Sequence, residues 1–352
     1  MLKKDLRSLN LEEMQDLMKT LKEPPFRAKQ LMQWVHNKGI ENLAEIKNFN
    51  NDLKEKIAAS AEISCLKLIK KQVSQDGTQK YLFQLADEQY VECVLMRYRG
   101  MKSKQRNTLC VSSQVGCAMG CGFCATGLGG FKRNLSTGEI LSQVYTVNKY
   151  LQKEHEELAV GNVVYMGMGE PLLNFAQVLK SIRLLNEPYG QNIGMRRITI
   201  STCGIVPKIL ELADLNLELV LAVSLHAPTD QLRSQIMPIN LQYPLQKLKE
   251  ACIYYNQKTN RRITFEYALV NNFNDSREAA SKLVSYLKGI HCHINLIPVN
   301  PIVTEEFHRP NKVKIQKFLQ LLTGAGIEAS IREEKGTDIL AACGQLRGKV
   351  VE

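Results

Sequence analysis

The chain has 352 residues, 44% of them hydrophobic and 23% charged, which is an ordinary composition for a soluble globular protein. It carries 46 Lys and Arg against 35 Asp and Glu, a net charge of +11 that favours a polyanionic partner. No apolar leader follows Met1, and no apolar run approaches the roughly 18 residues of a membrane span. We therefore expect a cytoplasmic protein without structural disulfides.

Residues 1–62 are predicted to form a small helical accessory domain. Apolar residues recur there at helical spacing in two runs, and Pro24-Pro25 separates the two. The first run consists of Leu11, Met14, Met18 and Leu21, and the second of Ala28, Leu31, Trp34 and Val35.

Residues 63–106 are predicted to be a β-rich connection. Leu66–Val73 and Lys80–Leu85 alternate as strands do, and Asp76-Gly77 between them is typical of a hairpin turn. Basic residues gather just before the next region, and this clustering strengthens the expectation of a nucleic-acid partner. They are Arg97, Arg99, Lys102, Lys104 and Arg106.

Residues 107–352 are predicted to be the catalytic core, because strand and helix patterns alternate there. The strand candidates are Thr108–Ser112, Val163–Met166, Arg197–Ser201, Leu217–Leu225, Ile263–Leu269, Ile294–Val299 and Ile327–Ile331. The helix candidates between them are Phe175–Leu185, Val206–Leu212, Leu245–Gln257, Ser276–Leu287 and Val313–Leu322. Capping patterns mark two helix starts, one at Ser136 with Glu139 and one at Asp275 with Glu278. The pattern predicts an α/β fold, a partial (β/α)6-type barrel, with a doubly wound open sheet as the alternative.

Three cysteines follow the first of these strands with the spacing Cys-x3-Cys-x2-Cys: Cys117, Cys121 and Cys124. Three thiolates hold three corners of a four-iron cluster and leave the fourth iron open for a ligand. A zinc site is the rival, but zinc usually takes four protein ligands, and no fourth His or Cys lies within a few residues. The spacing therefore favours an iron–sulfur cluster with a reactive open position.

Polar side chains also lie where later strands end, and in a parallel barrel these ends form one mouth. They belong to Gly167–Pro171, Ser201, Ser224, His226 and Asn300. Glu170 suits a ligand amine, and the other polar groups suit a ribose or a carboxylate. A tight turn, local caps and a structural histidine explain the same residues without a ligand.

Two further cysteines remain open to two interpretations. Cys110 lies on the strand that leads into the cysteine loop, and Cys343 lies near the end of the chain. They are either buried fillers or a reactive pair in which one thiol resolves a bond made by the other.

With these segments in order, the chain resembles the RlmN/Cfr family of radical S-adenosylmethionine RNA methyltransferases over nearly its whole length. The segments that carry the resemblance are 110–117, 166–174, 224–228 and 341–346. The resemblance implies that Cys117, Cys121 and Cys124 hold a [4Fe–4S] cluster whose open iron binds S-adenosylmethionine. It also implies a cofactor pocket formed by Gly169, Glu170, Ser201, Ser224, Leu225, His226 and Asn300.

The resemblance further implies a methylated-cysteine route that uses two S-adenosylmethionine molecules per turnover. Cys343 takes a methyl group from the first, and the radical derived from the second activates that methyl for addition to an adenine ring. Glu92 is implied as the acceptor of the ring proton. Cys110 is implied to form a disulfide with Cys343 that releases the RNA from its covalent adduct.

The family's substrates imply partners for this chain: adenosine in the peptidyl-transferase centre of 23S ribosomal RNA, adenosine 37 of some transfer RNAs, and a flavodoxin-like electron donor. They also imply that the accessory domain, residues 1–62, binds RNA by gripping its phosphates. Pro171 and the residues after it resemble the branch that methylates carbon 2. Carbon-8 methylation, as in the Cfr branch, is the alternative within the family. A zinc-stabilised RNA-binding module without catalysis is the alternative from another class. We expect a monomer that does not bind membranes.

Overall fold

A mixed sheet of ten strands forms the centre of the computed structural model, which describes residues 3–99, 105–300 and 307–349. Its strand order is β14-β13-β12-β11-β10-β9-β6-β5-β4-β3. All neighbours from β6 to β14 are parallel, and those from β3 to β6 are antiparallel. The parallel strands are β6 (Arg106–Cys110), β9 (Val160–Tyr165), β10 (Ile198–Thr202), β11 (Val220–Ser224), β12 (Ile263–Leu269), β13 (Cys292–Pro298) and β14 (Ala329–Ile331).

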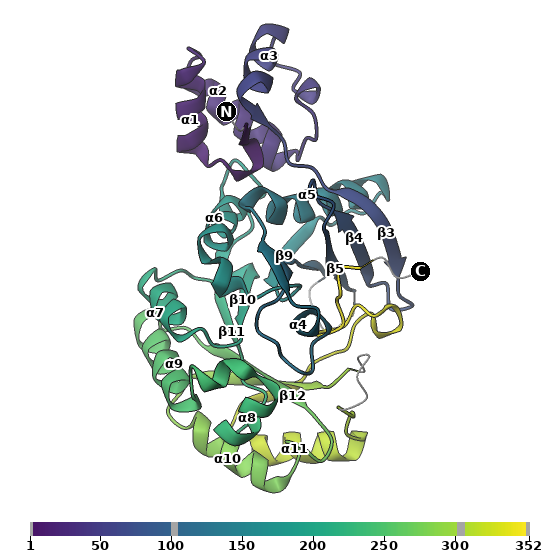
Figure 1. Cartoon of the computed structure of the whole chain (residues 1–352), viewed down its shortest axis with the longest axis vertical. Helices are drawn as coiled ribbons and strands as arrows, with labels where there is room; N and C mark the ends of the chain where they lie inside the picture. Colours follow the sequence, from purple (N-terminus) through teal and green to yellow (C-terminus); the bar gives the residue numbers. More distant parts are fainter. Residues whose placement is uncertain (1–2, 100–104, 301–306, 350–352) are drawn as a thin grey trace.

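The parallel strands follow one another in chain order without a reversal, and helices cover their outer side (Figure 1). A doubly wound sheet would reverse its strand order at a switch point, so the alternative fold is excluded. β14 and β3 are the two edges of the sheet, so the barrel is open. The prediction of an α/β partial barrel is therefore confirmed.

The helices of the core are close to those predicted from the sequence. They are α5 (Thr137–Lys153), α6 (Phe175–Asn186), α7 (Val206–Asp214), α9 (Leu245–Thr259), α10 (Arg277–Leu287) and α11 (Lys312–Gly324), together with the short α4 (Ala125–Leu128) and α8 (Asp230–Ile236). The capping box of Ser136 and Glu139 is present at the start of α5.

The predicted cap at Asp275 is wrong. Ser276 is the N-cap of α10, and its hydroxyl accepts a hydrogen bond from the amide of Ala279 at 3.0 Å. The Asp275 carboxylate instead accepts from the amide of Asn272 at 2.9 Å, which closes the preceding turn. Two adjacent residues with capping side chains compete here, and the backbone places Ser276 at the helix start.

The region predicted as a β-rich connection extends the same sheet. Its strands are β3 (Lys67–Val73), β4 (Gln79–Gln84) and β5 (Tyr90–Tyr98), and the predicted hairpin turn joins β3 to β4. The basic residues predicted to gather near its end are not all free. Arg97 forms ion pairs with Glu154 and Glu156, and Arg99 also pairs with Glu156. Lys102 and Lys104 lie outside the described residues.

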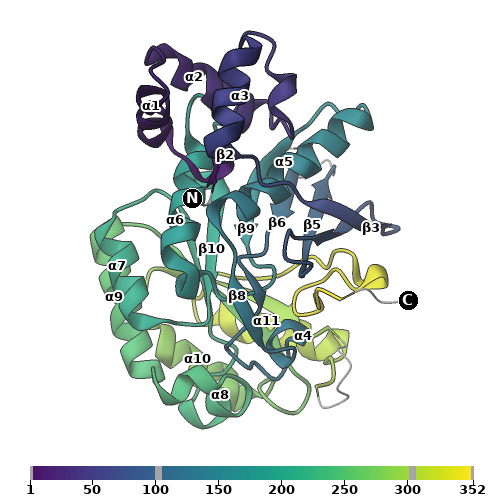
Figure 2. The same cartoon turned by 45° about the horizontal axis from the view of Figure 1, so that its top comes forward.

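The N-terminal helices form a separate layer at one end of the molecule (Figures 1 and 2). They are α1 (Leu11–Thr20), α2 (Phe26–Met32), the π-helical turn η2 (Gln33–Asn37) and α3 (Asn51–Ser60), and the short strands β1 (Lys4–Asp5) and β2 (Ala61–Glu62) pair beside them. Within the described ranges, no helix is both long enough and apolar enough to span a bilayer.

A buried arginine joins this layer to the core. Arg7 is fully buried and donates hydrogen bonds to the carbonyl of Ser64 and the hydroxyl of Ser142, both at 2.7 Å. It also donates to the carbonyl of Ile40 at 3.0 Å. Because Ser142 belongs to α5, one guanidinium ties the N-terminal layer to a helix of the catalytic core.

His36 lies in the same interface in its neutral form. Its Nε2 faces the carbonyl of Leu9 at 3.2 Å, so this nitrogen carries the proton, and Nδ1 accepts from the Tyr145 hydroxyl at 2.7 Å. Burial lowers the pKa of His36 to about 3, and the nearby charge of Arg7 acts in the same direction.

This burial makes the stability of the protein depend on pH. The folded-state pKa lies below the ordinary value, so the contribution is complete above about pH 6.5 and is lost as the pH falls toward 3. Between about pH 7 and about pH 5.5 we expect His36 to account for about 1 kcal/mol of lost unfolding free energy. In urea unfolding, the free energy of unfolding of His36→Gln should fall between these two pH values by about 1 kcal/mol less than that of the parent protein. The exposed His291→Gln should behave as the parent protein does, and an unchanged pH dependence in His36→Gln would contradict the assignment.

Candidate active site

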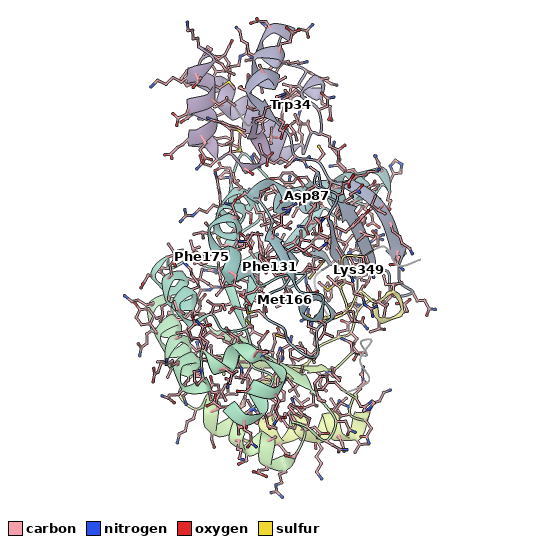
Figure 3. The ribbon with its side chains drawn as sticks, in the orientation of Figure 1. Trp34, Asp87, Phe131, Met166, Phe175 and Lys349 are labelled. Atoms are coloured by element: carbon pink, nitrogen blue, oxygen red, sulfur yellow. The ribbon has the colours of Figure 1, made fainter. Side chains whose placement is uncertain are left out.

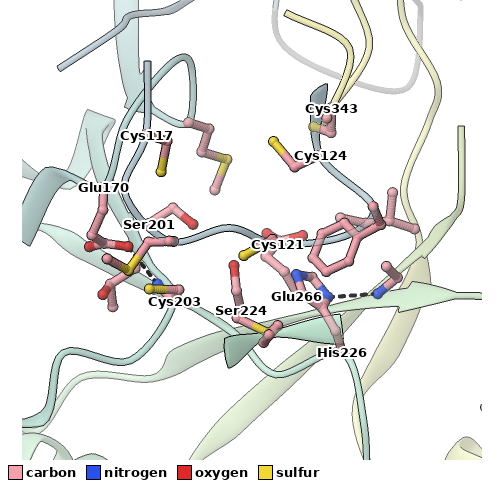
Figure 4. A pocket seen from close by; sticks show the side chains of 18 of the residues that line it. Cys117, Cys121, Cys124, Glu170, Ser201, Cys203, Ser224, His226, Glu266 and Cys343 are labelled. Atoms are coloured by element: carbon pink, nitrogen blue, oxygen red, sulfur yellow. Dashed lines mark hydrogen bonds between the residues drawn. The ribbon is translucent and has the colours of Figure 1, made fainter. Parts of the chain in front are cut away.

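A cavity opens at the carboxyl ends of the parallel strands, where the sequence predicted a mouth. It measures about 930 Å³ with its open entrance included. Figure 4 shows that side chains from the cysteine loop and from several strand ends face one another across it. The predicted residues that line it are Cys117, Cys121, Cys124, Gly169, Glu170, Ser201, Ser224, His226, Asn300 and Cys343.

The cysteine loop lies between two short paired strands, β7 (Gln114–Gly116) and β8 (Phe131–Asn134). The amide of Cys117 donates to the carbonyl of Gly130 at 2.8 Å and closes the loop. Gly116 has a φ of +75°, and a Cβ there would lie 1.9 Å from the Gly130 carbonyl oxygen, so only glycine fits. These two contacts hold the ends of the loop together, and all three thiols of the loop line the cavity.

The three cysteines of the loop fit an iron–sulfur cluster, because their thiols face one cavity. Burial raises the pKa of Cys117 to about 12 and raises that of Cys121 still further. Such thiols ionise only when a metal supplies positive charge beside them. Within the described part of the chain, no three His, Cys, Asp or Glu side chains are arranged to hold one metal ion. All three thiols line the cavity, and three thiolates are the ligand set that leaves one iron of a four-iron cluster open.

The Gly169-Glu170 turn is fixed by backbone contacts. A Cβ on Gly169, whose φ is +101°, would lie 2.5 Å from the Cβ of Gln114. The carboxylate of Glu170 accepts from the amide of Cys203 at 2.8 Å and from the amide of Leu172 at 3.0 Å. Burial raises the pKa of Glu170 while these hydrogen bonds oppose the rise. Its carboxylate thus shapes the cavity wall as well as facing the ligand space.

His226 is a neutral part of the wall. Its Nδ1 accepts from the amide of Ala268 at 2.8 Å, and its ring meets that of Phe123 edge-on with centroids 4.7 Å apart. Burial lowers the pKa of His226 to about 3. Leu225 does not line the cavity; its side chain is buried and its carbonyl accepts from Arg233 at 3.1 Å.

Asn300 has a buried side-chain oxygen without a hydrogen-bond donor among the described residues. Its amide nitrogen donates to the carbonyl of Cys343 at 3.2 Å. Its Oδ1 is buried and has no hydrogen-bond partner among the described residues. A buried acceptor without a donor is unfavourable unless a bound group satisfies it. This atom is therefore placed for a donor on a cofactor, such as a ribose hydroxyl or an adenine amine.

The C-terminal segment brings Cys343 to the cavity. The carbonyl of Gly344 accepts from the amide of Ala125 at 2.7 Å, and the carbonyl of Leu346 accepts from the Thr126 hydroxyl at 2.6 Å. Both donors belong to the first turn of α4, directly after the cysteine loop. Cys343 also shares an adjoining cavity with Cys110. All ten cysteines, which all lie in the described ranges, are free thiols.

Glu92 is not among the described residues that line the cavity. Its carboxylate accepts from the amides of Arg347 and Gly348, at 2.6 and 2.9 Å, and forms an ion pair with Lys80 at 3.2 Å. The segment that carries Cys343 therefore covers Glu92. The role implied for this carboxylate stays a prediction, and it requires that the cover be released.

Three other residues of the site were not selected from the sequence. Arg233 is fully buried and donates to the carbonyls of Cys203 and Ser224, at 2.7 and 3.1 Å, so it ties two strand ends together. Glu266 and Arg332 line the cavity and face each other at 3.6 Å. The acidic residue inside the apolar run of β12 was a usable signal for Glu266, whereas the contacts of both arginines depend on tertiary structure.

Comparison with known proteins agrees with this geometry. Residues 111–284 match the radical SAM superfamily, and residues 4–63 match the ribosomal RNA large subunit methyltransferase N-terminal domain. A solved radical SAM methyltransferase from Sphaerobacter thermophilus superposes with a TM-score of 0.93 at 41% identity, covering 98% of this chain and 100% of that one. The fold and the cysteine loop thus define a radical S-adenosylmethionine enzyme, which uses a [4Fe–4S] cluster and S-adenosylmethionine.

Relatives define the family within this class. Probable dual-specificity RNA methyltransferases RlmN from Desulfitobacterium hafniense and Lachnospira eligens are 50% and 47% identical to the chain. The first alignment covers 97% of this chain and 96% of the relative, and the second covers 99% and 97%. The chain therefore belongs to the RlmN family of radical S-adenosylmethionine RNA methyltransferases. A zinc-stabilised module without catalysis is excluded.

The packing of α4 against the cysteine loop predicts a selective loss of the cluster. A Cβ on Gly127 would lie 2.9 Å from the backbone nitrogen of Cys121, whereas a Cβ on Gly129 would make only ordinary contacts from 3.4 Å. We expect Gly127→Ala to displace Cys121 and to retain about threefold less iron than Gly129→Ala after anaerobic reconstitution. Iron and sulfide analysis with the visible absorbance measures this. Equal iron in the two variants would show that the loop tolerates the methyl group.

Proposed function

We propose that this enzyme methylates carbon 2 of adenosine in 23S ribosomal RNA and of adenosine 37 in transfer RNAs, through a methylated Cys343. The observation that carries the proposal is that Cys343 lines the same cavity as the three cysteines of the loop. The names of the relatives, which describe dual-specificity RNA methyltransferases, support two RNA substrates. The proposal includes a flavodoxin-like electron donor, a monomeric enzyme and action in the cytoplasm, where both RNA classes are made.

The chemistry of the target explains why these cofactors suit the reaction. Carbon 2 of adenine is electron-poor and does not act as a nucleophile. When bound, the cluster and S-adenosylmethionine supply a methyl group and a radical, which needs no nucleophilic acceptor. Cys117, Cys121 and Cys124 would hold the cluster. Gly169, Glu170, Ser201, Ser224, His226 and Asn300 would surround the cofactor, and Leu225 would act only through its backbone.

Cys343 and Cys110 have different proposed tasks. Cys343 would accept the methyl group on its sulfur and carry it toward the RNA base. Burial raises the pKa of Cys110 to about 12, so its thiol is neutral in this arrangement, and the nearby charge of Arg332 partly offsets the rise. Cys110 would attack the sulfur of Cys343 after losing its proton, and a disulfide would form as the bond from that sulfur to the methylene carbon of the adduct breaks. The electron pair of the broken bond would stay on this carbon, which would take up a proton and become the methyl group of the product.

Glu92 would accept the proton that leaves the adenine ring. The amides of Arg347 and Gly348 now occupy its carboxylate, so this task follows release of the C-terminal segment. Movement of that segment would therefore change the position of Cys343 and the exposure of the Glu92 carboxylate together.

Nucleoside analysis tests the proposal directly. Reconstituted enzyme is incubated with S-adenosylmethionine, a reductant and each RNA class, and the digested RNA is examined by mass spectrometry. We expect 2-methyladenosine from both RNAs. The 8-methyl isomer would assign the chain to carbon-8 chemistry, and unmodified adenosine in both RNAs would overturn the proposal.

Substitution of the two cysteines should give opposite results. Cys110→Ala is expected to accumulate a covalent protein–RNA adduct, visible as a slowly migrating gel band, because the resolving thiol is absent. Cys343→Ala should form no adduct and lose methyl transfer while keeping its cluster absorbance. Cys252→Ala is the control, because Cys252 is buried away from both cavities. Turnover by Cys343→Ala, or no adduct with Cys110→Ala, would show that the assigned roles are wrong.

A further inference from the structure

A buried lysine lies in the antiparallel part of the sheet. Lys80 belongs to β4, whose first five residues are all buried, and only 8% of Lys80 is exposed. Lysine is almost never buried this deeply unless its charge is paired, because removing an ammonium from water is costly. Within the described ranges its one carboxylate partner is Glu92, at 3.2 Å. The ammonium therefore neutralises the carboxylate that is proposed to accept the ring proton.

Strand register places this pair beside the two cysteines of the adjoining cavity. Lys80 lies opposite Val94 on β5, and Val94 lies opposite Cys110 on β6. Residues that lie opposite each other in antiparallel strands point to the same face of the sheet, and so does Glu92, two residues before Val94. Val94, Cys110 and Cys343 line the adjoining cavity. The pair thus lies on the face of the sheet where the two thiols of the proposed reaction meet.

The main chain of Glu92 is held by two neighbouring strand ends. Its carbonyl accepts from the Ser112 hydroxyl at 2.6 Å, and the same hydroxyl accepts from the amide of Met168 at 2.9 Å. Its amide donates to the sulfur of Met168 at 3.4 Å. With the backbone fixed in this way, the side-chain torsions of Glu92 decide where its carboxylate points.

The two carboxylate oxygens of Glu92 have different partners. Oε1 faces the Lys80 ammonium at 3.2 Å, whereas Oε2 accepts from the amides of Arg347 and Gly348, at 2.6 and 2.9 Å. Release of the C-terminal segment would free Oε2 and leave Oε1 on the ammonium. We propose that Lys80 is the positioning residue of Glu92: it holds Oε1 so that Oε2 faces the adenine ring once the segment has moved away.

The proposal rests on the proposed function, because it concerns the step in which Glu92 takes the ring proton. In that step the proton passes from carbon 2 of the adduct to Oε2, and the electron pair of the broken C–H bond stays in the ring. A general base is effective only within hydrogen-bond reach of the proton that it removes. Loss of the contact to Oε1 should therefore slow proton removal and leave the earlier steps unchanged.

Lys80 also contacts the C-terminal segment itself. Its ammonium donates to the carbonyl of Leu340 at 3.2 Å, and the φ of Leu340 is +54°, a backbone state that leucine rarely adopts. Lys349, just beyond the amides that cover Glu92, lies in Figure 3 in the region where Figure 1 labels β4 and β5. Lys80 thus bridges Glu92 and the segment that covers it, and Glu92 is the partner that remains when the segment leaves.

Lys80→Met removes the charge and keeps an unbranched side chain of similar length. We expect this variant to form methylated Cys343 as the parent protein does, which the mass of the intact protein shows after incubation with S-adenosylmethionine and a reductant. Formation of 2-methyladenosine in transfer RNA should be about 100-fold slower, because a misplaced base removes the proton slowly. The covalent protein–RNA adduct should accumulate as a slowly migrating gel band.

Deuterium at carbon 2 of the target adenosine tests the step directly. It should slow Lys80→Met more than it slows the parent protein, because proton removal has become the slowest step. Loss of a buried ion-pair partner lowers stability. The isotope effect compares two substrates on the same protein, so it does not depend on how much of the variant is folded.

Two further variants serve as controls. Lys80→Arg keeps a cation at this place and should recover most of the rate, because a guanidinium also donates to a carboxylate oxygen. Lys71→Met removes a cation of the neighbouring strand β3, whose partner is Glu154, and should behave as the parent protein does. Cluster absorbance and transfer RNA affinity, measured for each variant, are expected to match those of the parent protein.

Four results would overturn the proposal. The first is a parent-like rate of methyl transfer in Lys80→Met, and the second is an isotope effect no larger than that of the parent protein. The third is the loss of methylated Cys343 together with the product, which would show general damage to the site. The fourth is an equal defect in Lys80→Arg and Lys80→Met, which would show that the charge does not matter.

Glu92→Gln separates this proposal from the proposed function. Slow methyl transfer in Glu92→Gln with a normal rate in Lys80→Met would refute the role of Lys80 alone. A normal rate in Glu92→Gln would refute the task that the proposed function gives to Glu92, and the role of Lys80 with it.

Discussion

The contact between the C-terminal segment and the first turn of α4 determines how this site is built. Two backbone carbonyls, of Gly344 and Leu346, accept hydrogen bonds from the residues that directly follow the cysteine loop. A Cβ on Gly344 would lie 3.0 Å from the carbonyl oxygen of Phe123, so the two segments approach too closely for a side chain there. Cys343 and the three cysteines of the loop thus share one cavity because two backbones pack directly against each other.

The rest of the fold supplies a rigid frame for that contact. The parallel strands deliver their carboxyl ends to one mouth, and Arg233 ties two of those ends together from beneath. The N-terminal layer is fixed to the same frame by Arg7, whose guanidinium bonds to both the layer and α5. Removing a buried guanidinium of this kind would leave several acceptors without donors, at a cost of about 1–3 kcal/mol for each. A surface on the N-terminal layer therefore keeps a defined position relative to the cavity.

Much of this arrangement could be predicted from the sequence, because it depends on local patterns and on one rule of parallel sheets. The strand–helix alternation gave the barrel, and the rule that strand ends meet at one mouth brought Cys117 and Asn300 together. Contacts between distant residues carried no such signal. Arg97 and Glu156 are far apart in the sequence, and so are Glu92 and Arg347, and only the folded chain brings each pair together. For the same reason the sequence did not show that Arg97 and Arg99, near the cysteine loop, form ion pairs with Glu154 and Glu156.

The C-terminal segment also covers Glu92. The amides that hold its carboxylate lie four and five residues beyond Cys343, so the carboxylate stays covered while this segment keeps its place. Cys110 is kept as a neutral thiol by burial in the neighbouring cavity. In this arrangement the Glu92 carboxylate is covered and the Cys110 thiol is buried, whereas Cys343 already lines the main cavity. Displacement of the segment would therefore uncover the Glu92 carboxylate and move Cys343 in a single step.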